Sequence, residues 1–231
     1  MLRLEGITLR WGEFRLSADF TVAAGLRVAV LGPSGAGKST LLDLIAGFLV
    51  PDAGRVLWQG RDITAEPPGA RPVSILFQDN NLFPHLTAAQ NVALALSPAL
   101  RLNGDGWRRV EEALARVGLA GMERRRPAQL SGGERGRVAL ARAALSGRPL
   151  MLLDEPFAAL GPAMKADMLA LVAGIAADRG TTVLMVSHDP ADAEALCGQT
   201  ILVADGRATP PVPTARLLAD PPPALAAYLG R

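Results

Sequence analysis

Short apolar runs alternate with longer segments of helical periodicity along most of the chain. The run LRVAVLG at 26–32 predicts a buried strand, and STLLDLIAGFL at 39–49 has apolar residues at the spacing of an amphipathic helix. A further helix is predicted after Pro162. This alternation favours an α/β fold with a mainly parallel sheet. Further strands are predicted at 54–60, 72–78, 149–155, 181–188 and 199–207.

The pattern changes between about Pro84 and Leu145, where helical segments follow one another without an intervening strand. We interpret this stretch as an inserted helical subdomain, residues 84–146, within a core formed by residues 1–83 and 147–231. The proline-rich tail is expected to hold one or two short helices.

The composition indicates a globular domain. The chain has 231 residues, of which 49% are apolar, and this length suits one domain with a subdomain. Its 24 basic and 22 acidic residues nearly cancel, which argues against a nucleic-acid partner held by charge alone. The single cysteine, Cys197, excludes an internal disulfide and is interpreted as a small buried hydrophobe. No signal peptide and no run of about 20 apolar residues is recognisable, so a cytosolic location is expected, with any membrane role acting through a partner.

A glycine-rich motif, GPSGAGKST, follows the first buried strand and opens a helix, and it matches G-x-x-x-x-G-K-[ST] in full. Its glycines allow backbone amides to surround a phosphate chain. Lys38 is predicted to place positive charge on the β- and γ-phosphates, and the Ser39 hydroxyl to coordinate Mg²⁺. The alternative is an ordinary glycine-rich turn, which the full match disfavours. The candidate nucleotide-binding residues are Gly32, Pro33, Ser34, Gly35, Ala36, Gly37, Lys38, Ser39 and Thr40.

Two adjacent carboxylates, Asp154 and Glu155, end the apolar run LMLLDE. Consecutive residues on a strand point to opposite sides, so the two acids are expected to have different roles. Asp154 is predicted to bind Mg²⁺, and Glu155 to act as general base towards the attacking water. The alternative is a solvated strand end, which the phosphate motif in the same chain disfavours.

Three further candidates rest on weaker patterns. His188 ends a predicted strand at the carboxyl edge of the sheet, where it could hydrogen-bond a γ-phosphate, although a lone histidine is more often structural. Gln78 ends another predicted strand, and its amide could contact Mg²⁺ or the water. Trp11 is either a packed core residue or a platform that stacks on adenine, and the pattern leaves both interpretations open.

The stretch QLSGGERG places two glycines at the start of a helix. Ser131 with Glu134 three residues later forms a capping box, which requires neither Gly132 nor Gly133. Bare amides at a helix N-terminus bind anions, so Ser131, Gly132 and Gly133 are interpreted as an anion-binding step.

These motifs together resemble the ATP-binding subunits of ABC transporters. The resemblance implies a P-loop NTPase core of the RecA type with an N-terminal antiparallel β region and an inserted helical subdomain, and ATP and Mg²⁺ as ligands. It also implies a head-to-tail dimer in which Ser131, Gly132 and Gly133 hold the γ-phosphate of the nucleotide bound to the second copy. Two positions depart from the family pattern: Glu134 replaces a glutamine, and Gly161 replaces an aspartate that connects the two sites.

Within that family, the sequence around Gln78 is most similar to the ATPases of bacterial thiamine importers. The resemblance implies integral membrane permease subunits as partners, a periplasmic solute-binding protein as an indirect partner, no nucleic acid, and a location on the cytoplasmic face of the inner membrane. Importers of iron, sulfate, molybdate or polyamines share much of this surface and remain an alternative.

Two other classes are less favoured. A soluble ABC ATPase of DNA repair or translation usually carries a long coiled coil, for which the segment between Thr40 and Leu130 leaves no room. A non-hydrolysing regulator is disfavoured by Glu155 and His188. Residues 189–231 are too few for the C-terminal regulatory domain of many related importers.

Overall fold

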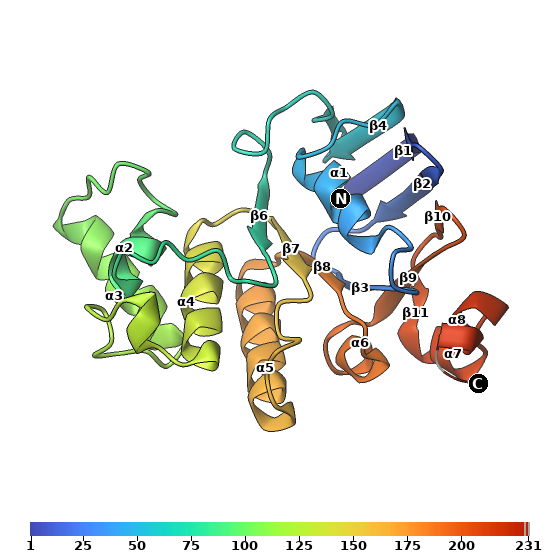
Figure 1. Ribbon diagram of the computed structural model, residues 1–231. Helices are drawn as coiled ribbons and strands as arrows, with labels where there is room; N and C mark the ends of the chain where they lie inside the picture. Colours follow the sequence, from blue (N-terminus) through green and yellow to red (C-terminus); the bar gives the residue numbers. More distant parts are fainter. Residues whose placement is uncertain (229, 231) are drawn as a thin grey trace.

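The computed structural model describes residues 1–228 and 230, and folds them around one curled sheet (Figure 1). Within this part of the chain the sheet has 11 strands in the order β5-β4-β1-β2-β10-β9-β3-β8-β7-β6, with β11 paired to β9. The strands are β1 (Leu2–Trp11), β2 (Phe14–Val22), β3 (Arg27–Leu31), β4 (Ala53–Trp58), β5 (Arg61–Asp62), β6 (Val73–Leu76), β7 (Leu150–Asp154), β8 (Thr182–Val186), β9 (Gln199–Ala204), β10 (Arg207–Ala208) and β11 (Val212–Pro213). The helices are α1 (Lys38–Ala46), α2 (Ala88–Ala93), α3 (Gly104–Arg116), α4 (Gly132–Leu145), α5 (Pro162–Arg179), α6 (Pro190–Leu196), α7 (Thr214–Ala219) and α8 (Pro223–Tyr228), with a 3₁₀ turn at Pro127–Gln129.

Five strands, in the order β9-β3-β8-β7-β6, are parallel and form the centre of the sheet. Val28 pairs with Leu184, and Leu152 pairs with the same residue from the other side. Because the strands run in one direction, their carboxyl ends meet at one edge, where ligands of such sheets bind. The phosphate motif, the acid pair and His188 all begin at this edge.

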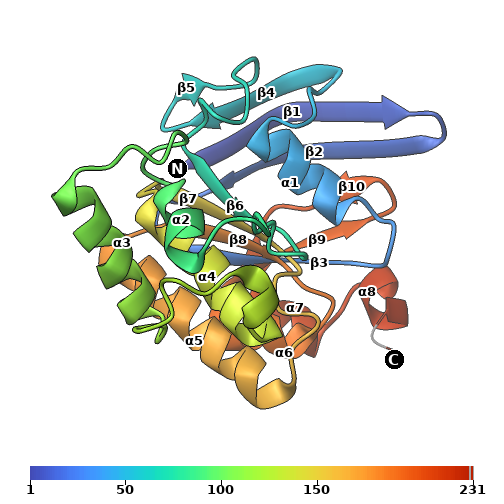
Figure 2. The same ribbon diagram turned by 60° about the vertical axis from the view of Figure 1, so that its left-hand side comes forward.

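An antiparallel arm of β1, β2, β4 and β5 extends the sheet on one side. Helix α1 lies between this arm and the parallel strands (Figure 2), and its buried Leu41, Leu44 and Ile45 join one hydrophobic cluster with both. The opposite face of the parallel strands is covered by α4, α5 and α6, which share a second cluster that includes Met168 and Leu225.

Helices α2, α3 and α4 follow β6 without an intervening strand among the described residues. They pack around a third cluster that includes Val92, Leu114 and Val138. Each begins with a side-chain cap, supplied by Thr87, Asn103 and Ser131. The predicted fold class, with its parallel core, antiparallel arm and helical insertion, is confirmed.

One local prediction was wrong, and one helix was missed. The strand predicted at 72–78 ends at Leu76, so Gln78 lies in a turn that continues into Asn80 and Asn81, both with left-handed backbone (φ 61° and 43°). Helix α6 was not predicted because its seven residues are too few to show a period; Asp189 caps it through Ala191 N–H at 3.0 Å.

Burial shifts the pKa values of two residues in the core, Arg71 and Cys197. The Arg71 guanidinium closes the C-terminal end of α1 by donating to the carbonyls of Leu44 (2.7 Å) and Ile45 (2.9 Å), and burial lowers its pKa. Burial raises the pKa of the Cys197 thiol to about 12, so it is an inert hydrophobic residue, as its sequence context predicts.

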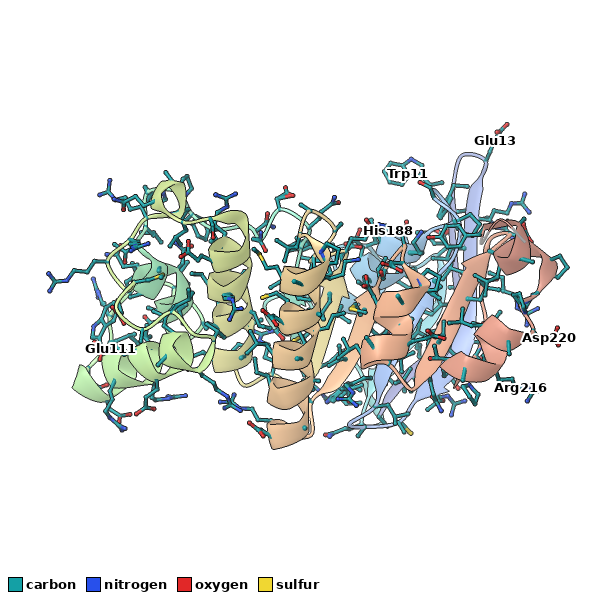
Figure 3. The ribbon with its side chains drawn as sticks, turned by 90° about the horizontal axis from the view of Figure 1, so that it is seen from below. Trp11, Glu13, Glu111, His188, Arg216 and Asp220 are labelled. Carbon is teal, nitrogen blue, oxygen red and sulfur yellow. The ribbon has the colours of Figure 1, made fainter. Side chains whose placement is uncertain are left out.

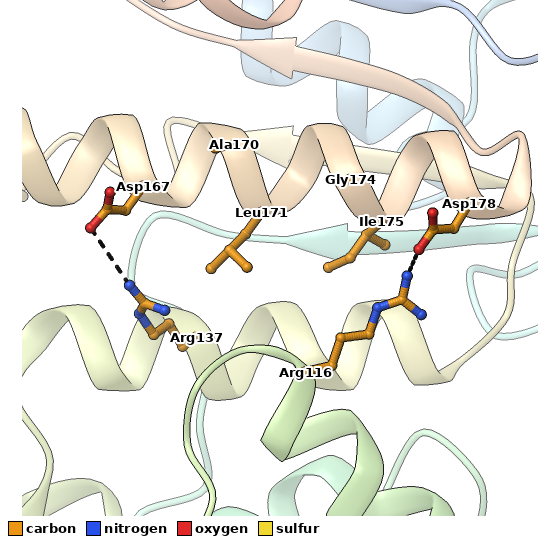
Figure 4. A pocket seen from close by; sticks show the side chains of 8 residues that line it. All are labelled: Arg116, Arg137, Asp167, Ala170, Leu171, Gly174, Ile175 and Asp178. Atoms are coloured by element: carbon orange, nitrogen blue, oxygen red, sulfur yellow. Dashed lines mark ion pairs between the residues drawn. The ribbon is translucent and has the colours of Figure 1, made fainter.

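A cavity of about 450 Å³ lies between α5 and the helices α3 and α4 of the inserted helical segment (Figure 4). Arg137 of α4 lies 3.9 Å from Asp167 of α5, and Arg116 at the end of α3 pairs with Asp178. These ion pairs tie the two parts of the molecule together. None of the residues lining the cavity is a candidate site residue. Across the described residues, every helix is too short or too polar to cross a bilayer.

Candidate active site

The phosphate motif forms a loop between β3 and α1. Gly32 has φ 151°, and a Cβ there would lie 2.0 Å from the Val203 carbonyl oxygen, so no other residue fits. Gly37 adopts φ 104° at the N-cap of α1 and contributes no side-chain cap. The first amides of α1 therefore stay available to an anion in the loop.

Lys38 lies inside this loop. Its ammonium donates to the carbonyl oxygens of Gly32 at 2.8 Å and Pro33 at 2.9 Å. Burial lowers the pKa of Lys38, against the opposite effect of Glu155 and Asp154. The charge is thus held at the centre of the loop, with two carboxylates close enough to influence it.

Ser39 and Asp154 meet across the edge of the sheet, with the serine hydroxyl donating to Oδ1 of Asp154 at 3.1 Å. Burial raises the pKa of Asp154, while the Ser39 hydrogen bond acts in the opposite direction. A hydroxyl and a carboxylate are oxygen ligands of the kind Mg²⁺ prefers. No cluster of three or more His, Cys, Asp or Glu residues able to hold a metal occurs in the described part of the chain, so phosphate oxygens and water would complete the coordination.

Glu155 leaves the strand in a different direction. Its backbone is left-handed, with φ 45°, and its N–H donates to the Val186 carbonyl at 3.2 Å. Such a conformation is unfavourable for a residue with a side chain and is concentrated at functional sites. The half-buried carboxylate Oε2 lies 3.5 Å from Nδ1 of the exposed His188. The two acids at the end of strand β7 therefore face different partners: Asp154 faces Ser39, and Glu155 faces His188.

Two candidates stand apart from this group. Gln78 is exposed in the turn after β6 and makes no hydrogen bond to the other candidates within the described residues. Trp11 is 74% exposed at the end of β1 (Figure 3), which excludes the interpretation that it is a packed core residue. Its stacking on adenine stays a prediction.

The N-terminus of α4 is a capping box. Ser131 Oγ accepts from Glu134 N–H at 3.3 Å, and Glu134 Oε2 accepts from Ser131 N–H at 2.7 Å. These hydrogen bonds lower the pKa of Glu134, and Arg125 lies 4.0 Å from its second oxygen. The departure from glutamine is therefore accommodated because the carboxylate folds back on its own helix.

Ser131, Gly132 and Gly133 are called the signature step below, and its two glycines are confined to different degrees by their surroundings. A Cβ on Gly133 would lie 2.1 Å from Sδ of Met164, so the residue is confined by packing against α5. Gly132 is exposed, and the closest atom to a Cβ there would be 3.9 Å away on Arg135. Because the first helical amides have no acceptor within the helix, those of Gly132 and Gly133 remain available as donors at the N-terminus of α4.

Gly161, at the second departure, is the N-cap of α5 and makes no side-chain cap. Its φ of −65° is open to any residue, and a Cβ would meet no atom within 4 Å. Neither backbone strain nor packing in this chain requires glycine here.

Sequence reasoning missed two groups beside the site. Arg142 of α4 donates to the carbonyls of Asn81 (2.8 Å) and Asn80 (2.9 Å), and so supports the left-handed turn that follows Gln78. An arginine between the buried Ala141 and Ala143 was the available signal.

The second missed group holds the loop after β8. Lys165 of α5 bonds Asp189 at 3.0 Å and Asp192 at 3.1 Å, and Asp192 accepts from the Ser187 hydroxyl at 2.6 Å. These contacts fix Ser187 and Asp189, the residues on either side of His188. No pattern in the sequence marks this contact, because it joins elements that are distant in the chain.

The family described as ABC transporter matches residues 16–158. This chain belongs to the ABC transporter family. Two full-length relatives carry the name thiamine import ATP-binding protein. The relative from Cereibacter sphaeroides is 64% identical over 230 residues, and the match covers 100% of this chain and 100% of the relative. That of Yersinia pseudotuberculosis is 49% identical, with 100% of this chain and 97% of the relative covered.

Solved ABC cassettes share the architecture. One is a dimeric post-hydrolysis state bound to ADP and Pi; it is 30% identical, with a TM-score of 0.81 over 93% of this chain and 99% of that one. Against this family background, the structure gathers Lys38, Ser39, Asp154, Glu155 and His188 at one edge of the sheet. The signature step at the start of α4 makes no hydrogen bond or ion pair with the phosphate loop in the described residues, and Figure 1 shows α4 with the helical segment, away from α1.

Proposed function

We propose that this chain is the ATP-hydrolysing subunit of a bacterial thiamine importer. The observation that carries the proposal is identity of 64% along the full length of a protein named for thiamine import, with the phosphate loop, acid pair and signature step intact. The solute does not touch this chain, which converts ATP binding and hydrolysis into movement of membrane subunits.

Each site residue has a task in this proposal. The loop amides of 32–40 and the Lys38 ammonium bind the β- and γ-phosphates. Ser39, Asp154 and the Gln78 amide hold Mg²⁺, which neutralises phosphate charge when bound. Trp11 stacks on adenine from its exposed position.

Hydrolysis itself falls to Glu155. Its carboxylate accepts a proton from the attacking water, and His188, 3.5 Å from that carboxylate, orients the water and the γ-phosphate. The left-handed backbone of Glu155 directs the carboxylate away from Asp154, so the base is not consumed in metal binding.

The site is completed by a second copy. The N-terminal amides of Gly132 and Gly133 and the Ser131 hydroxyl bind the γ-phosphate held by the partner's phosphate loop. The capping box permits this arrangement because the Glu134 carboxylate accepts the hydrogen bond of the Ser131 amide. The negative charge of Glu134 is thereby directed away from the phosphate. Closure around ATP is then favoured by phosphate contacts on both sides.

Exposed aromatic side chains on the segments next to Gln78 are the proposed contact with the membrane subunits. Phe48 and Phe83 are 49% and 48% exposed, and the Phe48 ring lies 5.9 Å from that of Phe77. An amphipathic helix of a permease subunit would cover these rings and so place this chain at the cytoplasmic face of the inner membrane.

The test is the assembled transporter. The chain is co-purified with its membrane subunits in lipid, and ATP hydrolysis is measured with the solute-binding protein loaded with thiamine, sulfate, iron, molybdate or a polyamine. Stimulation by thiamine alone supports the proposal. Stimulation by another solute would retain the ATPase role and replace the substrate, whereas an absence of magnesium-dependent hydrolysis would remove the role itself.

A further inference from the structure

The final helix of the described chain reaches the catalytic loop. The hydroxyl of Tyr228 in α8 donates to the backbone carbonyl of His188. Tyr228 is the single tyrosine of the sequence, and its partner is forty residues away. No motif recognised in the sequence includes this tail, so the contact lies outside the set of residues already assigned to ATP.

The tail is attached firmly enough to place a hydroxyl. Strand β11 pairs with β9, and the buried Thr214 bonds the Cys197 carbonyl at 2.9 Å and the Thr200 hydroxyl at 2.9 Å. In α8 itself, Leu225 is completely buried in the cluster shared with α5 and α6. The Tyr228 ring packs against the same cluster. Helix α8 is therefore part of the core rather than a loose end.

The loop that carries His188 is consequently held from two sides. On one side, Ser187 and Asp189 are tied to α5 and α6 through Lys165 and Asp192. On the other, the Tyr228 hydroxyl restrains the peptide carbonyl of His188 itself. Burial, together with Glu155 and Asp189, raises the pKa of Tyr228, so its hydroxyl stays protonated and able to donate.

We propose that Tyr228 is a positioning residue for hydrolysis, which sets the orientation of the His188 imidazole towards Glu155 by holding the His188 carbonyl. This inference rests on the proposed ATPase function and adds the C-terminal tail to the machinery of that site. Because peptide orientation and side-chain direction are coupled, loss of the hydroxyl frees the ring to leave its position 3.5 Å from Glu155.

The first test reads the histidine directly and needs no turnover. The sequence has two histidines, His85 and His188, so the ring signals of isotope-labelled protein are few and are assigned with His85→Gln. We expect Tyr228→Phe to move the His188 ring signals and leave those of His85 in place. Unchanged His188 signals would overturn the proposal, whether or not the wild-type chain hydrolyses ATP.

The second test is kinetic. We expect Tyr228→Phe to lower kcat for ATP hydrolysis about threefold to tenfold, the effect of one neutral hydrogen bond, with KM within twofold of wild type and a melting temperature lowered by no more than about 4 °C. The matched control is Arg216→Ala, an exposed change on the same tail that Figure 3 shows away from His188, and it should leave kcat unchanged. An unaltered kcat, or a fall in kcat accompanied by an equal rise in KM and a fall in melting temperature well beyond about 4 °C, would overturn the positioning role.

Discussion

Oε2 of Glu155 lies 3.5 Å from Nδ1 of His188, although the two residues follow different strands. Strands β7 and β8 are adjacent and parallel, so their carboxyl ends bring the two side chains together. The left-handed backbone of Glu155 completes the approach by turning the carboxylate away from Asp154. The proposed base and orienting group are therefore placed by sheet topology and one strained residue.

Replacing Glu155 by Gln keeps the shape of the side chain and removes the proposed base. We expect hydrolysis to fall by about 10²-fold or more, while ATP binding remains and a closed dimer accumulates. Phosphate release and size-exclusion chromatography with ATP measure the two effects. Glu13→Gln, in the exposed hairpin between β1 and β2, is the control. Wild-type turnover by Glu155→Gln would show that another group accepts the proton.

Replacing Ser131 by Arg places a long cation in front of the amides of α4. We expect ATP-dependent dimerisation to be lost while the isolated chain still binds ATP. Ser131→Ala is the comparison: it removes the helix cap, at a cost of about 1 kcal/mol in stability, and the hydroxyl contact to phosphate, but it does not fill the space in front of Gly132, so we expect dimerisation to be weakened and not lost. Dimerisation of Ser131→Arg at wild-type ATP concentrations would contradict the role of the signature step.

Replacing Arg142 by Met removes two hydrogen bonds and retains the aliphatic stem. The Asn80 and Asn81 carbonyls lose their donors, so we expect a loss of about 2 kcal/mol in the free energy of unfolding. Denaturant titration measures it, with Arg109→Met on the exposed face of α3 as control. If the two variants were equally stable, Arg142 would not support the turn after Gln78.

The ion pair of Lys165 and Asp189 predicts a pH dependence of stability. The Lys165 hydrogen bond, which outweighs burial, holds the pKa of Asp189 below its ordinary value of 3.8. Burial alone would lower the pKa of Lys165, but its hydrogen bonds to Asp189 and Asp192 raise it above 10.5. The acid therefore stabilises the fold above pH 3.8 and loses this effect as the pH falls through its lowered pKa. The lysine stabilises it below pH 10.5 and loses this effect as the pH rises through its raised pKa.

Lys165→Met removes both contributions at once. We expect it to lower the melting temperature most between about pH 5 and pH 9, and progressively less outside that window. Melting curves of the wild type, Lys165→Met and Lys165→Arg across pH give the comparison, with the arginine variant retaining most of the effect. A difference that is constant with pH would mean that the aliphatic stem of Lys165, and not its charge, contributes the stability.

Trp11 is exposed, so its replacement should change ligand binding without changing the fold. We expect Trp11→Ala to weaken ATP binding about tenfold, the value of one aromatic stacking contact, and Trp11→Phe to retain most of the affinity. Equilibrium binding to the Glu155→Gln background avoids hydrolysis during the measurement. Equal affinities in all three proteins would show that Trp11 does not stack on the nucleotide.

The sequence was most informative where a local pattern has a local cause. Membership of the ABC transporter family, inferred from motif order, is confirmed, as is the α/β fold class. Gly32 illustrates why: the need for glycine arises from one backbone torsion and one neighbouring strand, and it is visible as a motif.

Contacts between distant segments could not be predicted in this way. Arg142 supports Asn80 from 62 positions away, and Tyr228 supports His188 from 40 positions away. No local pattern in the sequence links the two residues of either pair. The end of the strand before Gln78 was wrong by two residues: β6 ends at Leu76, and Gln78 lies in the turn that leads to the left-handed Asn80 and Asn81.

Cys197 has a practical consequence. It is the one thiol of the sequence, and with a pKa of about 12 it supplies almost no thiolate at neutral pH. The natural chain is thus a chemically silent background for engineered cysteine pairs. A cysteine at exposed Ser34 in one molecule and at Gly132 in the other would report, by disulfide formation, when two faces meet during each cycle of nucleotide loading.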